Sequence, residues 1–305
     1  MAADNAPKVG LALGSGASRG WSHIGVIKAL LREGIEPDIV CGASVGAIIG
    51  GSYVAGNLDK LENWVLGSTR TDVLRFFEIN FSSAGFVDNE RLSWFLHNFV
   101  ANENVRIEDL PKKFAAVSTN LETGREVWFM EGGLADAVRA SMAMPGLFPA
   151  VRNNDRWLVD GGLVNPVPVT TCRALGADVV IAVNLNAYII GKHTQKNKPA
   201  EPGEPRGILG NFKQSAREYS NSIFPERDDR DATPGLFYAI ANSINIFQDR
   251  ITRSRLAGDP ADVLIAPNVA HIGMLEFHRA SEAIEEGAQC VQRELAEIRR
   301  GTSAH

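Results

Sequence analysis

A serine flanked by glycines stands where a catalytic nucleophile would be expected. Ser44 lies in the segment Gly42-Ala43-Ser44-Val45-Gly46, between an apolar run that predicts a strand and a run of small residues that predicts a helix. Gly42 and Gly46 let the chain turn sharply, so the hydroxyl projects at the helix N-terminus, where the backbone potential favours negative charge. The segment predicts a nucleophilic serine; its structural alternative is a turn of small residues.

A glycine-rich loop, Gly14-Ser15-Gly16-Ala17-Ser18-Arg19-Gly20, also follows a predicted strand and precedes a predicted helix. Successive backbone N–H groups in such a loop bind negative charge, either a dinucleotide pyrophosphate or the oxyanion of a tetrahedral intermediate. A dinucleotide site needs an acidic residue at the end of the next strand, whereas Asp38 precedes that strand. We therefore predict an oxyanion hole, with nucleotide binding as the minority alternative, formed by the amides of Gly14, Ser15, Gly16 and Ala17.

A carboxylate that could serve as the base occurs in Asp160-Gly161-Gly162, at the end of a predicted strand over 156–160. The carboxyl ends of parallel strands share one sheet edge, which would bring Asp160 to the serine and the glycine loop. None of the six histidines lies in a catalytic motif. We therefore expect Asp160 to act as the base directly, supported by Gly161 and Gly162. Its ordinary pKa of about 3.9 requires that burial raise its basicity. Taken alone, D-G-G is also a common turn.

The remaining pattern alternates strands with helices. Apolar runs predict strands over residues 8–13, 38–42, 113–118, 127–130, 156–160, 179–184 and 261–267. Helical periodicity separates them, most clearly over 23–33, 45–54, 235–256 and 281–300. This alternation predicts an α/β fold with a mostly parallel central sheet and helices on both faces. We expect one domain, made of a flexible N-terminus over 1–7, a catalytic core over 8–190, and C-terminal helices with a strand over 234–305.

A polar, proline-rich stretch over residues 191–233 interrupts this alternation. Loops of this length inside compact domains are usually either functional or disordered. The insertion is therefore predicted to be either a lid over the acyl site or a mobile surface segment.

Composition narrows the function classes. The net charge of −5 argues against a nucleic-acid partner. The three cysteines, Cys41, Cys172 and Cys290, lie far apart without C-x-x-C spacing, which argues against a disulfide framework or a zinc site. The first residues predict no secretory signal, and no apolar run reaches the ~18 residues of a membrane span. We expect a soluble, cytoplasmic protein without metal or other cofactor, contacting membranes only peripherally; nothing in the pattern indicates an oligomeric state.

The order of these motifs, glycine-rich loop, G-x-S-x-G and later D-G-G, resembles the patatin-like phospholipase family, specifically its bacterial members. The resemblance covers about residues 8–185 and includes 139–149, before the aspartate; residues 251–260 are similar to the C-terminal extension of a bacterial subgroup. It implies hydrolysis of phospholipid or lysophospholipid esters through an acyl-enzyme on Ser44, with Asp160 as base and no metal.

The resemblance also bears on the roles of Arg19 and Ser15. Arg19 matches a basic position of the family's loop, where it either binds phosphate or braces the loop. Ser15 departs from the family pattern, because many relatives carry glycine there; since the backbone amide would do the chemistry, little loss is expected. The alternative to the enzyme is a non-catalytic regulatory or nucleotide-binding protein that keeps the same architecture.

Overall fold

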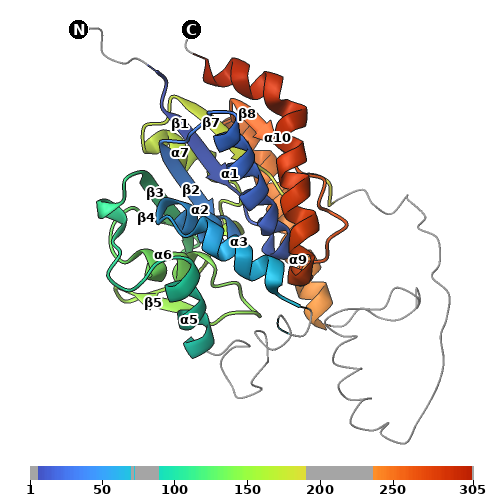
Figure 1. Ribbon diagram of the computed structural model, residues 1–305. Helices are drawn as coiled ribbons and strands as arrows, with labels where there is room; N and C mark the ends of the chain where they lie inside the picture. Colours follow the sequence, from blue (N-terminus) through green and yellow to red (C-terminus); the bar gives the residue numbers. More distant parts are fainter. Residues whose placement is uncertain (1–5, 70–71, 73–88, 190–235, 304–305) are drawn as a thin grey trace, which may run out of the picture.

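The computed structural model describes residues 6–69, 72, 89–189 and 236–303 (Figure 1). The predicted insertion over 191–233 and most of the expected N-terminal segment 1–7 lie outside these residues. The strands are β1 (Val9–Leu13), β2 (Ile39–Ala43), β3 (Lys113–Asn120), β4 (Glu126–Phe129), β5 (Val151–Asn153), β6 (Arg156–Asp160), β7 (Val179–Val183) and β8 (Val263–Ile265).

The helices connect and cover these strands. They are α1 (Ser22–Arg32), α2 (Val45–Val54), α3 (Leu58–Gly67), α5 (Asn89–Phe99), α6 (Leu134–Ser141), α7 (Val169–Ala174), α9 (Leu236–Gly258) and α10 (Ala280–Thr302). Short 3-10 turns are η1 (Ala17–Trp21), η2 (Ile107–Asp109), η3 (Gly161–Leu163) and η5 (Phe277–Arg279). Most predicted elements agree with these bounds within a few residues, whereas α3 and α5 were not predicted as helices.

The strands form one sheet in the order β5-β6-β3-β2-β1-β7-β8, with β4 paired to β3. Strands β3, β2, β1, β7 and β8 run parallel to one another. Strands β4, β5 and β6 add antiparallel pairings at one side. The prediction of an α/β fold with a mostly parallel sheet is confirmed.

Both faces of the sheet are covered by helices. Side chains along a strand alternate between the two faces, and in this sheet the side chains on both faces are apolar and need covering. In β1, Leu11 and Leu13 belong to the larger core cluster, which also contains buried residues of α1, α2 and α10. Ala12 belongs to a separate cluster on the other face, which contains Cys172 of α7. Continuous apolar strands are what a sheet buried on both faces requires.

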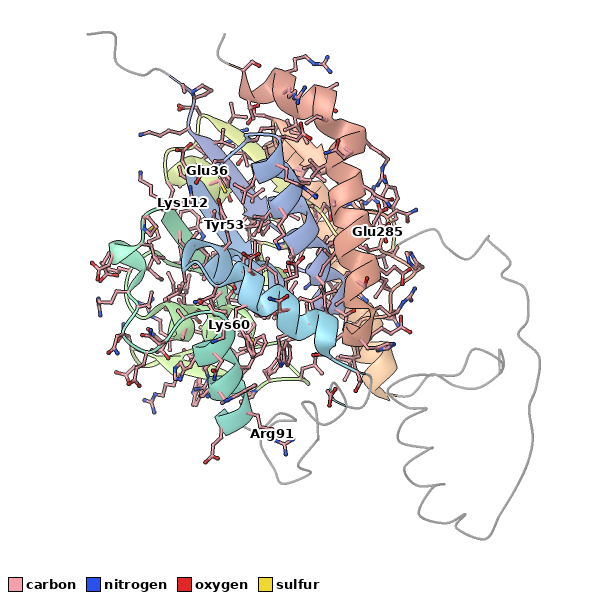
Figure 2. All side chains as sticks on the ribbon, in the orientation of Figure 1. Glu36, Tyr53, Lys60, Arg91, Lys112 and Glu285 are labelled. Carbon is pink, nitrogen blue, oxygen red and sulfur yellow. The ribbon has the colours of Figure 1, made fainter. Side chains whose placement is uncertain are left out.

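The far end of the sheet, at the amino ends of the parallel strands, is fixed by polar contacts. Asp38 Oδ2 accepts a hydrogen bond from the Val9 amide at 2.8 Å, so this carboxylate lies at the opposite end of the sheet from Ser44. Nearby, Lys112 pairs with Glu36 at 2.7 Å and lies over the Tyr53 ring (Figure 2). Asp38 therefore has a structural partner, and its placement does not fit a ribose site beside the glycine loop.

Strand β6 reaches the carboxyl end of the sheet from an unexpected direction. Val117 of β3 pairs with Ala43 of β2, and the next residue, Ser118, pairs with Asp160 of β6. Strand β4 occupies the other edge of β3 at both positions, so β2 and β6 share one edge and meet end to end. The expectation that Asp160 ends a parallel strand is wrong, because β6 is antiparallel to β3; the end-to-end meeting nevertheless places Asp160 directly beyond Ala43.

Glycines at positions 42 and 46 permit the close packing of the turn after β2. A Cβ on Gly46 would lie 2.1 Å from the carbonyl oxygen of Leu13, and one on Gly42 would lie 2.4 Å from the carbonyl oxygen of Gly46. Both contacts are with backbone atoms, which cannot rotate away as a flexible side chain can. The turn therefore packs against β1 at a separation that only glycine allows.

We expect Gly46→Ala to lower the free energy of unfolding by about 2 kcal/mol or more, because overpacking against backbone forces the chain to shift. Urea unfolding followed by circular dichroism measures the change. The matched control is Gly67→Ala at the end of α3, where a Cβ would meet nothing within 4 Å. Equal stability of the two variants would contradict this account of the turn.

Candidate active site

Ser44 occupies a strained turn between β2 and α2. Its φ of 57° and ψ of −124° lie in a region that residues with a Cβ rarely adopt. The turn is held by Ser141 at the end of α6, whose hydroxyl accepts from the Ser44 amide at 3.0 Å and donates to the Val117 carbonyl at 2.5 Å. Ser141 lies within the segment 139–149 of the family resemblance, but its role was not predicted, because a serine at a helix end has no distinctive pattern.

The Ser44 hydroxyl donates a hydrogen bond directly to a buried carboxylate. The distance from Ser44 Oγ to Asp160 Oδ2 is 2.5 Å, and Asp160 Oδ1 accepts from the Gly162 amide at 2.7 Å. Asp160 has no solvent exposure. Burial raises the pKa of Asp160 to about 7 and outweighs the opposing hydrogen bonds from Ser44 and Gly162. The carboxylate is therefore far more basic than an exposed aspartate.

The glycines after Asp160 allow the chain to approach β3. A Cβ on Gly161 would lie 2.0 Å from the Val117 carbonyl oxygen. This close approach lets the Gly162 amide fold back onto the Asp160 carboxylate. Both glycines thus support the placement of Asp160, by geometry that no larger residue permits.

His23 contacts the glycine loop and does not lie between Ser44 and Asp160. Its Nε2 lies 2.7 Å from the carbonyl oxygen of Gly14, an acceptor, so Nε2 carries the proton. Burial lowers the pKa of His23 to about 4, which keeps the ring neutral at physiological pH. The contact between Ser44 and Asp160 is direct, with no histidine interposed.

The glycine loop offers fewer free amides than the sequence suggested. The Gly14 amide donates to the Val183 carbonyl at 3.1 Å, and the Ser15 amide donates to the Pro166 carbonyl at 2.8 Å. The prediction that these two amides bind an oxyanion is therefore wrong: both are already used by the fold. The amides of Gly16 and Ala17 donate to no acceptor within the described part of the chain, and Ala17 lines the same pocket as Ser44.

Arg19 braces this loop. Its Nε donates to the carbonyl of Gly16 at 3.1 Å and its guanidinium donates to Asn245 Oδ1 of α9 at 2.7 Å. Because a trans peptide is planar, holding the Gly16 carbonyl on one side directs the Ala17 N–H to the other. Burial lowers the pKa of Arg19 to about 10, so it remains charged at neutral pH. Of the two roles considered for Arg19, its 2% exposure and occupied donors favour bracing over phosphate binding.

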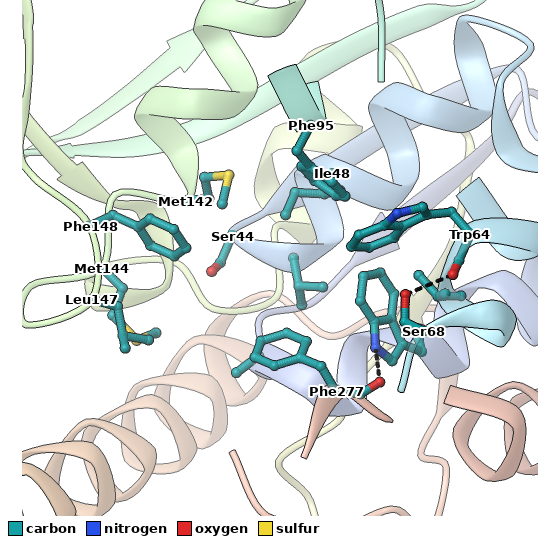
Figure 3. Close-up of a pocket in the computed structure, with 14 residues that line it drawn as sticks. Ser44, Ile48, Trp64, Ser68, Phe95, Met142, Met144, Leu147, Phe148 and Phe277 are labelled. Atoms are coloured by element: carbon teal, nitrogen blue, oxygen red, sulfur yellow. Dashed lines mark hydrogen bonds between the residues drawn. The ribbon is translucent and has the colours of Figure 1, made fainter. Parts of the chain in front are cut away.

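An apolar pocket opens beside Ser44 (Figure 3). Two of its polar groups are already satisfied by its own walls: Trp21 Nε1 donates to the Phe277 carbonyl, and the Ser68 hydroxyl to the Trp64 carbonyl. The wall of the pocket is therefore mostly hydrocarbon. Its lining residues are Ala17, Trp21, Ser44, Val45, Ile48, Trp64, Val65, Ser68, Phe95, Met142, Met144, Leu147, Phe148 and Phe277.

Sequence reasoning missed this pocket. Trp64 and Phe95 lie on α3 and α5, and Phe277 on η5, three elements far apart in the chain. Periodicity marks such residues as apolar and inward-facing, but it does not distinguish a cavity wall from filled core.

Two kinds of feature are absent from the described residues. No group of three or more histidine, cysteine, aspartate or glutamate side chains is placed to hold a metal ion within them. Among the helices of the described segments, none has the length and apolar character needed to cross a bilayer. Cys41, Cys172 and Cys290 are free and buried.

Known proteins are similar in sequence to this chain, some of them over most of its length. Residues 11–173 match the family model described as patatin-like phospholipase. An uncharacterised NTE family protein of Mycobacterium tuberculosis is 34% identical over 329 residues, covering 93% of this chain and 90% of that protein. Lysophospholipase NTE1 of Coccidioides immitis is 35% identical over 184 residues, 59% of this chain and 12% of that protein. The crystal structure of VipD from Legionella pneumophila aligns with a TM-score of 0.48 and 17% identity, over 95% of this chain and 67% of that one.

We expect Asp160→Asn to stabilise the fold relative to wild type increasingly as pH rises from 4 to 7. The folded pKa of about 7 exceeds the unfolded value near 3.8, so between these values the folded state binds the extra proton. Wild type therefore loses stability as pH rises through this window, on the order of 3 kcal/mol in all, whereas the amide does not titrate. Denaturant unfolding at several pH values measures the difference, and a difference independent of pH would contradict the raised pKa.

Proposed function

Because this chain belongs to the patatin-like phospholipase family, we propose that it hydrolyses lipid esters, with Ser44 as nucleophile and Asp160 as base. The observation that carries this proposal is the direct 2.5 Å hydrogen bond from Ser44 Oγ to a fully buried Asp160, at the edge of an apolar pocket. A serine, a buried carboxylate and an apolar pocket thus lie together, which supports an acyl hydrolase.

In the first step, Ser44 Oγ attacks the ester carbonyl carbon while its proton passes to Asp160 Oδ2. The raised pKa of about 7 makes this transfer less unfavourable than it would be with an exposed aspartate. Negative charge develops on the carbonyl oxygen, and the amides of Gly16 and Ala17 are the donors we assign to it. A donor of this kind lowers the barrier by about 3–4 kcal/mol.

Collapse of the tetrahedral intermediate breaks the bond to the leaving alcohol, which takes the proton from Asp160. Ser44 then carries the acyl group as an ester. A water molecule attacks this acyl-enzyme and gives its proton to Asp160. The second tetrahedral intermediate releases the fatty acid, and Asp160 returns the proton to Ser44 Oγ. Each step uses the same carboxylate alternately as base and acid.

The pocket accounts for a lipid substrate. An acyl chain entering beside Ser44 would contact aromatic and methionine side chains, with about 0.8 kcal/mol gained per buried methylene. One similar protein is named a lysophospholipase, which is consistent with phospholipid or lysophospholipid esters as substrates here. The alternative of a nucleotide-binding regulatory protein fits less well, because two amides of the glycine loop are occupied and Asp38 lies at the other end of the sheet.

We expect a fluorophosphonate probe to add one adduct to the folded protein and none to Ser44→Ala, because only an activated serine displaces fluoride from such a reagent. Intact-protein mass spectrometry measures the adduct. The matched control is Ser52→Ala, which removes the serine within α2, one that donates to the Phe99 carbonyl outside the pocket. Absence of the adduct in wild type, or its persistence in Ser44→Ala, would overturn the assignment of the nucleophile.

We expect Ile48→Phe to shorten the acyl chains that the site accepts. Ile48 lies one helical turn after Ser44 and lines the pocket (Figure 3), so a larger side chain there displaces the distal part of the acyl chain. Loss of two methylene contacts, at ~0.8 kcal/mol each, lowers kcat/KM for long-chain esters about tenfold relative to butyryl esters. Leu31→Phe, on the exposed side of α1, serves as control. Equal loss for all chain lengths would contradict this view of the pocket.

A further inference from the structure

A cluster of buried polar atoms lies behind the carboxylate of Asp160. Three atoms surround the position that a Cβ on Gly162 would take: Ser15 Oγ at 2.2 Å, Gln248 Nε2 at 2.6 Å and Asp160 Oδ1 at 2.9 Å. Glycine at 162 is therefore needed for this cluster to form, since any side chain would displace it. Gln248 comes from α9, the helix that also supplies Asn245 to Arg19.

Two of these atoms are donors without an acceptor. Ser15 is fully buried and Gln248 is 2% exposed, and neither Ser15 Oγ nor Gln248 Nε2 has a hydrogen-bond partner among the described residues. Leaving a buried polar group unpaired costs about 1–3 kcal/mol. The other end of the Gln248 amide is paired, because Oε1 accepts from Asn186 Nδ2 at 3.2 Å. This contact holds the amide with Nε2 and Asp160 Oδ1 both beside the position that a Cβ on Gly162 would take.

The third atom is an acceptor with spare capacity. Asp160 Oδ1 accepts one hydrogen bond, from the Gly162 amide, whereas an ionised carboxylate oxygen accepts about two. We propose that Gln248 is a positioning residue for the base, whose Nε2 donates to Asp160 Oδ1 when the carboxylate is ionised. This inference rests on the proposed function, in which Asp160 takes the proton of Ser44.

The consequence concerns the pH at which the base becomes active. A donor aimed at the ionised carboxylate stabilises that form and partly offsets the burial that disfavours it. Gln248 would thus allow Asp160 to be buried enough to be basic and still ionise near neutral pH. The Gln248 amide stabilises the ionised carboxylate without adding a charge to the site, whereas a lysine at this position would add one.

Other titratable groups lie on the elements packed around Asp160. His23 is neutral above a pH of about 4, and Arg19 stays charged at neutral pH, braced by Gly16 and Asn245. The remaining charged groups there are held by partners of their own: Asp249 with Arg253, Glu126 with Arg255, and Arg139 of α6. The acidic limb of the rate profile therefore reports on Asp160.

The test compares the pH dependence of kcat/KM on p-nitrophenyl butyrate for wild type and Gln248→Met, which keeps the length of the side chain and removes its donor. We expect the midpoint of the acidic limb to move up by about one pH unit or more, the loss of one hydrogen bond to a charged group. The isosteric Gln248→Glu should move the midpoint further, since a second carboxylate opposes ionisation of the first; it also carries the test if Gln248→Met does not fold.

Thr252→Val is the matched control. It removes a buried hydroxyl one turn along α9, whose only assigned role is a hydrogen bond to the Gln248 carbonyl, so its midpoint should stay at the wild-type pH. Unchanged midpoints in both Gln248 variants, with hydrolysis retained, would overturn the inference while leaving the proposed function intact.

A second readout does not depend on activity. If wild type hydrolyses nothing, the proposed function fails, and the ionisation of Asp160 is then followed through unfolding. Asp160→Asn is made in the wild-type and in the Gln248→Met background, and each is compared with its parent. In each background, the difference in stability between the Asp160→Asn variant and its parent should stop growing at the pH where Asp160 ionises. With Gln248→Met this pH should be higher by the same amount as the midpoint of the rate profile. An identical value in the two backgrounds would show that Gln248 does not act on Asp160.

Discussion

The hydrogen bond between Ser44 and a buried Asp160 is the interaction on which the rest of this structure depends. In the proposed reaction Asp160 takes the proton of Ser44 directly, and a carboxylate in water is too weak a base for this step. Desolvation makes the carboxylate more basic. Desolvation requires a closed environment, and closing it requires backbone contacts that only glycine permits. Gly46 lies against β1, Gly161 against β3, and Gly162 against the side chains of Ser15 and Gln248. The glycines of the motifs thus follow from one requirement, namely that the carboxylate of Asp160 be removed from water.

This arrangement carries local costs that the remaining fold must offset. Ser44 and Ala17 both have positive φ values, and Asp160 and Arg19 are buried ionisable groups. Strained backbone of this kind costs of order 1–3 kcal/mol per residue and persists only where the surroundings fix it. Here the surroundings are a sheet covered on both faces and a brace from α9 through Asn245. Burial of the Asp160 carboxylate lowers the stability of the fold at neutral pH while it raises the basicity that the proposed reaction needs. The expected stabilisation by Asp160→Asn follows from this.

Different elements position the polar groups of the site and form its apolar wall. Strands and the turns after them fix Ser44 and Asp160 to the sheet, whereas α3, α5 and η5 supply the pocket wall against which an acyl chain would lie in the proposed reaction. The placement of Ser44 and Asp160 depends on backbone geometry and tolerates little change. The wall depends on apolar volume, which many side chains can provide, so chain-length preference can vary without loss of chemistry.

The sequence by itself determined the local features: most strands and helices, the sharp turn at Ser44, and the glycine loop, because each is marked by residue types within a short stretch of chain. It also singled out Asp160 by its place at a strand end. Only the tertiary structure decided that β6 is antiparallel and meets β2 end to end, and that Gln248 lies near Asp160. It also decided that, among the described residues, the amides of Gly16 and Ala17 are those of the glycine loop left without an acceptor. These facts depend on strand register and on contacts between segments up to about two hundred residues apart, which no local periodicity specifies.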